Sequence, residues 1–118
     1  MEVGFKKLIA WQKSYELSLE IYKITKDFPE HERFGLISQM RRAAVSVVAN
    51  IAEGYERPHR KDYLKFLVIA KGSLSELETF LLLSRDLRYL KMDQYGQIAA
   101  RREEVGRLLN GLIRSLLV

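Results

Sequence analysis

LISQMRRAAVSVVANIAEGYER, residues 36–57, places two different faces on one helical pattern. At 100° per residue, one arc carries the apolar side chains Leu36, Met40, Ala43, Ala44, Val47, Val48 and Ile51. A second arc, called the polar ribbon below, carries Gln39, Arg42, Ser46, Asn50 and Glu53. A helix of this kind buries its apolar arc and offers hydrogen bonds from its side. The stretch therefore predicts a packed helix of an all-α protein.

Length and composition place the chain among folded, soluble proteins. Its 118 residues are typical of a single domain, residues 1–118, with 47% apolar and 30% charged residues. The absence of cysteine excludes disulfides, thiolate metal sites and thiol nucleophiles. The N-terminus lacks the apolar run of a signal peptide, and the longest uncharged run, residues 43–52, is too short to cross a membrane. We expect a cytoplasmic protein with no membrane contact.

Glycine and proline are scarce and fall between four helical segments. Pro29 interrupts the first segment, and Gly54 and Pro58 bracket the junction of the second and third. The predicted helices cover approximately residues 6–27, 34–55, 58–90 and 93–117, with Pro58 as the first residue of the third. Because the connections are short, the helices fold back as an antiparallel up-down-up-down four-helix bundle. Gly72, inside the third helix, is expected to mark a bend or a close helix contact.

The first and fourth helices carry more apolar surface than one sector of a bundle helix requires. The first helix has an inner stripe of Ala10, Leu17, Ile21, Ile24 and Phe28. A second stripe, rotated by roughly 160°, consists of Leu8, Trp11, Tyr15, Leu19 and Tyr22. The fourth helix is apolar around much of its circumference at Tyr95, Ile98, Val105, Leu108, Leu109, Leu112, Ile113, Leu116 and Leu117. Large exposed apolar patches mark interfaces, so we expect a homo-oligomer. The alternative is a monomer with a wide core and aromatic residues capping its edge.

Motifs for catalysis or metal binding are missing from this pattern. A di-iron bundle needs paired Glu-x-x-His motifs, but only one such spacing occurs, at Glu56 and His59, and it straddles Pro58. His31, the other histidine, has no glutamate three residues before it. No Ser-His-acid arrangement and no glycine-rich phosphate loop can be argued from the spacing. We therefore expect no metal, no cofactor and no enzymatic activity.

The polar ribbon has two interpretations. In the first, Asn50 and its neighbours form a half-buried network that fixes helix register, with Glu53, Gln12, Ser73 and Glu76 as candidate partners. In the second, Gln39, Arg42, Ser46, Asn50 and Glu53 form a docking strip for a protein partner.

The predicted topology places the excess positive charge at one end of the bundle. The chain has 20 Lys and Arg against 15 Asp and Glu, a formal charge of +5. In the bundle, one end gathers His59 and the cations Lys6, Lys7, Arg57, Arg60, Lys61, Lys65 and Arg114, whereas charges at the other end balance. The start of the third helix points backbone N–H groups out of this basic end, an arrangement that favours phosphate. The alternative is an ordinary solvated surface.

Several segments carry a family resemblance. They include Trp11-Gln12, Phe28-Pro29, Phe34-Gly35-Leu36, the run SQMRRAAVSVVANIAEG, and Gly72-Ser73 with Glu76. Over nearly the whole chain these residues resemble the bacterial 23S rRNA-intervening-sequence proteins, which are small cytoplasmic four-helix bundles. That family is similar in fold to the accessory variability protein of diversity-generating retroelements, a basic pentameric barrel that binds nucleic acid and a reverse transcriptase. The resemblance implies a homo-pentamer.

Together these observations predict a non-enzymatic, ring-forming helical bundle that binds RNA or DNA through its basic end. The residues expected to contact nucleic acid are Lys6, Lys7, Arg57, Arg60, Lys61 and Lys65. The alternative function is a protein-interaction adaptor that docks a partner on the polar ribbon and makes no nucleic-acid contact.

Overall fold

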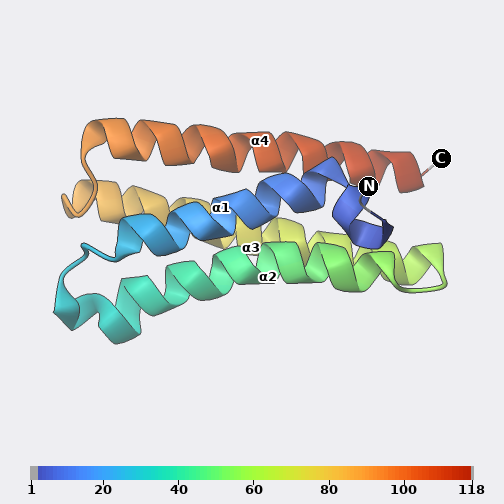
Figure 1. The fold of residues 1–118 in the computed structure, drawn as a ribbon, viewed down its shortest axis with the longest axis horizontal. Helices are drawn as coiled ribbons and strands as arrows, with labels where there is room; N and C mark the ends of the chain where they lie inside the picture. The colour runs from blue at the N-terminus through green and yellow to red at the C-terminus, as the bar shows by residue number, and fades with distance from the viewer. Residues whose placement is uncertain (1–2, 118) are drawn as a thin grey trace.

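Four α-helices and no strand are present in residues 3–117, the part of the chain that the computed structural model describes (Figure 1). The elements are the 3₁₀ turn η1 (Gly4–Lys7), α1 (Ile9–Thr25), the 3₁₀ turn η2 (Glu30–Glu32), the π-helical turn η3 (Arg33–Ile37), α2 (Ser38–Tyr55), α3 (Arg60–Asp86) and α4 (Met92–Leu116). The predicted all-α class is confirmed. None of the described helices combines the length and hydropathy that a membrane span requires.

The helix boundaries differ from the predicted ones where the backbone leaves helical geometry. Leu8 is extended, so Lys6 and Lys7 lie in η1 and not in α1. Pro58 lies before α3, because His59 is extended and serves as its N-cap. At the other end of α3, Arg88 has a φ of +64°, and the N–H groups of Tyr89 and Leu90 turn back to the Ser84 carbonyl. A left-handed residue ends a helix, so α3 stops before residue 90.

The helices lie side by side along the 43 Å long axis (Figure 1). Both α1 and α3 contact α2 and α4, which leaves α1 diagonal to α3. The two chain termini and the α2–α3 connection lie at one end of the molecule, called the terminal end below (Figure 1). The connections from α1 to α2 and from α3 to α4 lie at the opposite end.

The apolar arc of residues 36–57 forms the centre of the core. Met40, Ala43, Val47 and Ile51 are fully buried. The two helices α2 and α3 approach closely at Gly54, where an added Cβ would lie 2.8 Å from the Cβ of Phe66. This contact is one reason why α2 packs so extensively against α3.

Gly72 has a different environment from the one expected. It is exposed, and an added Cβ would meet nothing within 4 Å. The expectation of a close helix contact at Gly72 is therefore wrong for the part of the chain that the structure describes. The glycine that permits close packing is Gly54, near the end of α2.

The two helices with surplus apolar residues behave differently. In α1, Tyr15, Leu19 and Tyr22 are 47%, 56% and 43% exposed. These three residues of the second stripe are therefore not buried by any other part of residues 3–117. In α4, three apolar residues are buried and Tyr95, Leu108, Leu112, Ile113 and Leu116 pack against the core. Leu117 after the helix and Met92 at its start are exposed. The apolar surplus on α4 is therefore smaller than expected, because residues on both flanks of its buried face pack against the core.

Candidate functional site

The cations proposed to contact nucleic acid come from two segments at the terminal end. Lys6 and Lys7 lie on η1, and the others lie on or after the α2–α3 connection. All six side chains are exposed: Lys6, Lys7, Arg57, Arg60, Lys61 and Lys65. Arg114, on the last turn of α4, is exposed as well. The fold therefore brings together at one end cations that are far apart in the sequence.

Some of these cations are held by contacts within the chain. The Arg57 guanidinium donates to the Glu53 carboxylate at 3.1 Å and lies 4.8 Å from the centre of the Phe66 ring. The Lys7 ammonium lies 5.7 Å from the centre of the Tyr55 ring. These contacts fix the direction of both side chains, and the carboxylate offsets part of the Arg57 charge.

The first turn of α3 opens at the same end. No side chain caps this helix, and the His59 carbonyl accepts the N–H groups of Asp62 and Tyr63 at 3.1 Å. Asp62 adds one negative charge to the first turn. The helix dipole makes this position favourable for an anion, but Asp62 lowers that preference.

Tyr63, one turn into α3, is a feature that the sequence did not single out. Its hydroxyl is buried and has no hydrogen-bond partner within residues 3–117. Burial raises the pKa of Tyr63, with the Tyr55 hydroxyl as a smaller contribution. The two rings meet edge to face at 6.1 Å between their centres. Because Tyr63 also crowds Gly54, it forms part of the packing that positions the α2–α3 connection.

Two acidic groups at the opposite end have hydrogen-bond partners. The Glu32 carboxylate accepts the Leu36 N–H at 3.2 Å and the Tyr89 hydroxyl at 2.9 Å, and these bonds hold its pKa below the usual value. Arg85 donates to Asp86 at 2.8 Å, which lowers the pKa of the aspartate in the same way. The opposite end therefore presents less unbalanced charge than the terminal end.

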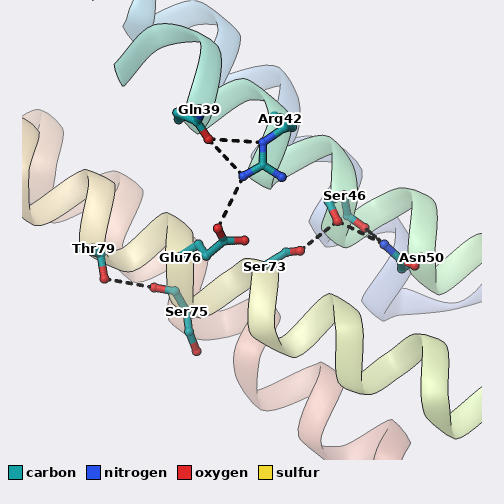
Figure 2. Close-up of polar contacts among 8 residues, drawn as sticks. All are labelled: Gln39, Arg42, Ser46, Asn50, Ser73, Ser75, Glu76 and Thr79. Carbon is teal, nitrogen blue, oxygen red and sulfur yellow. Dashed lines mark hydrogen bonds and ion pairs between the residues drawn. The ribbon is translucent and has the colours of Figure 1, made fainter. Parts of the chain in front are cut away.

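The polar ribbon runs along the α2–α3 contact, as Figure 2 shows. Asn50 donates to the Ser46 carbonyl at 2.8 Å and to the Ser46 hydroxyl at 3.0 Å. The hydroxyls of Ser46 and Ser73 meet at 2.8 Å and so join α2 to α3. These half-buried groups tie one helix to its neighbour and fix the register between them.

The part of the polar ribbon in the first turns of α2 is more exposed. Arg42 bonds to the Gln39 side chain at 3.0 Å and to the Glu76 carboxylate of α3 at 3.4 Å (Figure 2). Two of the expected partners of Asn50 lie elsewhere: Glu53 pairs with Arg57, and the Gln12 amide donates to the Lys6 carbonyl. Gln39 and Arg42 remain accessible, with the Arg42 side chain 55% exposed.

Within residues 3–117, no group of three or more His, Cys, Asp or Glu side chains could hold a metal ion. The hollows of the surface are open grooves. One of about 310 Å³ lies between α3 and α4 and is lined in part by Lys71, Arg102 and Arg107. Arg102 in this groove already pairs with Glu78 at 3.4 Å.

Comparisons with known proteins cover nearly all of this structure. The profile of a family described as 23S rRNA-intervening sequence protein matches residues 6–111. Among solved structures, the chain is similar to a protein of unknown function from the S23 ribosomal protein family of Bacteroides thetaiotaomicron. The two are 28% identical with a TM-score of 0.83, over 90% of this chain and 96% of that one. No curated protein matches the sequence. The match to the family includes all six cations and the whole polar ribbon.

Proposed function

The chain belongs to the 23S rRNA-intervening sequence protein family, and from this premise we propose a non-enzymatic nucleic-acid-binding protein that works through the terminal end. In this proposal the four helices form an antiparallel up-down-up-down bundle. Copies of the bundle assemble into a homo-oligomeric ring, with a pentamer favoured, and the ring binds RNA or DNA in the cytoplasm. Neither the family description nor that of the structural neighbour names a reaction, which agrees with a binding role.

The observation that carries the proposal is the group of exposed cations at the terminal end. Lys61 and Lys65 follow each other by one turn on α3, and no ion pair joins either to a carboxylate within residues 3–117. Arg57 and Arg60 flank them at the α2–α3 connection. Phosphate groups spaced along a polynucleotide would meet several of these charges at once, and each contact would release a counterion.

A ring of parallel copies would multiply the effect. All terminal ends would then share one face, and a polyanion could cross several of them. The charge on that face would also accelerate encounter with nucleic acid at low salt.

Replacement of Arg57, Arg60 and Lys61 by alanine tests the proposal. We expect the affinity for a fluorescein-labelled RNA oligonucleotide, measured by anisotropy at low salt, to fall at least tenfold. The melting temperature should change little, because these side chains are exposed. A matched variant removes Lys23, Lys26 and Arg33 from the opposite end and loses the same formal charge. It should retain most of the affinity.

Equal losses in both variants would mean that net charge, and not the terminal end, determines binding. Undiminished affinity of the first variant would contradict the proposal outright. Measurement of DNA and RNA oligonucleotides of the same sequence separates the two nucleic acids as ligands.

A second candidate function is a protein adaptor that uses the polar ribbon. The exposure of Gln39 and Arg42 favours it, because both could bond to a partner without breaking the Ser46–Ser73 contact. Replacement of Gln39 and Arg42 by alanine should then weaken capture of that partner with little dependence on salt. The same variant should leave RNA affinity unchanged if the terminal end is the binding surface.

A further inference from the structure

An exposed apolar surface, called the groove face below, lies on the outside of α1 and α2. It consists of Tyr15, Leu19 and Tyr22 of α1 and Val45 of α2, each between 41% and 56% exposed. The Arg41 guanidinium lies 4.6 Å from the centre of the Tyr22 ring and bridges the two helices. A shallow hollow of about 760 Å³ lies at one end of this face, between Tyr22, Val45 and the exposed Phe34 of η3. The exposed apolar area is on the order of a few hundred Å², at the upper limit for the surface of a monomer.

A second apolar surface lies on the outer side of α3. Val68 and Leu83 are 58% and 46% exposed, and Ile69 and Leu87 beside them are 47% and 50% exposed. Gly72, with open space around it, lies between Val68 and Leu83 on the same side of the helix. We call Val68, Gly72, Thr79 and Leu83 the α3 ridge. The sequence pattern did not reveal this ridge, because its apolar residues alternate with glycine, serine and threonine.

The two surfaces point in different directions. The helices α1 and α3 are diagonal, and each surface faces away from the core. Two different surfaces that fit each other make a head-to-tail contact.

The two surfaces also lie at the same level along the bundle. The Ser18 hydroxyl donates to the Ala44 carbonyl at 3.1 Å, which aligns the middle of α1 with α2. The Ser46 and Ser73 hydroxyls, 2.8 Å apart, align α2 with α3. With a rise of about 1.5 Å per residue, Leu19 therefore lies within a turn of Thr79 along the axis. Copies that point the same way would place the ridge opposite the groove.

Charges at the two ends of these surfaces are complementary in that arrangement. At the terminal end, Lys61 on the outer side of α3 lies level with Glu56 of α2, since Gly54 contacts Phe66 and Tyr63. Toward the opposite end, Asp86 of α3 also accepts a hydrogen bond from Arg85 of its own chain and lies within about a turn of Arg41, because Met40 contacts Ser84. Each acidic group would meet a basic group of the adjacent copy, an arrangement that favours parallel copies.

We infer that the α3 ridge of one copy packs into the α1–α2 groove face of the next, so that identical head-to-tail contacts close the ring. The inference rests on the self-assembly in the proposed function and identifies the surfaces that make it. Bulky Tyr15, Leu19 and Tyr22 would enclose the ridge, and the open space at Gly72 would let the two backbones approach. The contact hides Tyr15, Leu19 and Tyr22, the exposed part of the second stripe of α1.

Single cysteines test this contact directly, because the chain has none of its own. Leu19→Cys and Thr79→Cys chains, one carrying a size tag, are co-expressed and treated with a short bismaleimide. We expect a covalent pair that contains one chain of each kind, and no pair from either variant alone. The matched control combines Leu19→Cys with Lys61→Cys, which lies at the terminal end of the same side of α3 and should give no product. Linkage of Leu19→Cys chains to each other would overturn the inference.

Gly72→Gln supplies a second test that does not depend on labelling. A Cβ at Gly72 meets nothing within 4 Å of its own chain, so the fold tolerates the substitution, but the side chain would fill the contact. We expect sedimentation to show at least a tenfold higher concentration for half-assembly. Gly96→Gln is the matched control, since Gly96 of α4 is also exposed and open. Unchanged assembly of Gly72→Gln would contradict the inference.

The unmodified chain distinguishes the failure of this inference from failure of the proposed function. A chain that sediments as a monomer at every concentration would refute both the assembly and this contact. An oligomer whose cross-links join other surfaces would leave the assembly intact and refute the contact alone. The RNA affinity of Arg60→Ala, a change at a residue outside both surfaces, reports on the terminal end.

Discussion

The terminal end and the opposite end of the bundle use the same residue types but differ in how the charges are paired. At the opposite end, Glu32 has two hydrogen-bond donors and Asp86 has Arg85. At the terminal end, Arg57 has Glu53, whereas Lys61 and Lys65 form no ion pair within residues 3–117. In the proposed function, the cations gathered at the terminal end, more than the net charge of +5, attract the polyanion.

Packing also differs between the two ends, and Gly54 is the strongest test. An alanine Cβ would lie 2.8 Å from the Phe66 Cβ and 3.0 Å from the Tyr63 ring. We expect Gly54→Ala to lower the free energy of unfolding in urea by about 2 kcal/mol, because the contacting atoms lie near the α3 backbone. Gly96→Ala, the matched change toward the opposite end, should raise stability by about 0.5–1 kcal/mol. A neutral Gly54→Ala would show that the terminal end is loosely packed.

Removal of a tyrosine hydroxyl should have opposite effects at the two ends. The Tyr63 hydroxyl is buried without a partner, so Tyr63→Phe should raise the free energy of unfolding by about 1 kcal/mol. The Tyr89 hydroxyl donates to Glu32, so Tyr89→Phe should lower stability. Denaturant unfolding of both variants measures the contrast. A loss of stability in Tyr63→Phe would indicate a partner for its hydroxyl.

The pairing of Glu32 predicts a small dependence of stability on pH. Its lowered pKa means that the carboxylate stabilises the fold above pH 4.5. This contribution is lost as the pH falls through the lowered pKa. Wild type should therefore lose more stability between pH 6 and pH 3 than Glu32→Gln, measured by thermal unfolding. Parallel pH profiles would contradict the pairing at the opposite end.

The periodicity of residues 36–57 predicted the buried arc of α2 because an α-helix of known pitch converts sequence spacing into a face. It could not predict the end of α3, which depends on the left-handed backbone at Arg88. Counting apolar residues overestimated the exposed apolar surface of α4, because residues on both flanks of its buried face pack against the core. The surplus surface lies instead on α3, where Val68 and Leu83 are too far apart to form an obvious stripe.

The candidate site could be located from the sequence once the helices were assumed to fold back on each other. That assumption brings Lys6 near Arg57, although neither spacing nor charge alone relates them. The contacts of individual cations could not be predicted, because Arg57 over the Phe66 ring and Lys7 beside the Tyr55 ring depend on side-chain packing. The polar ribbon likewise needed the register of α2 against α3 before Ser73 could be identified as a partner.

Lys61 connects the two proposals. It lies among the cations of the terminal end and also on the side of α3 that would face Glu56 of the next copy. Lys61→Ala should therefore weaken both RNA binding and assembly, whereas Arg60→Ala should weaken RNA binding alone. Sedimentation and anisotropy on the same two variants measure this difference.

The most direct test of a nucleic-acid role for the terminal end is the salt dependence of RNA affinity. Wild type should show a linear fall of the logarithm of affinity with the logarithm of salt concentration. The Arg57, Arg60 and Lys61 alanine variant should reduce that slope by about 2, since each phosphate contact contributes about 0.7 on a single strand. The variant of Lys23, Lys26 and Arg33 should keep the slope of wild type. Equal slopes in all three proteins would contradict the account.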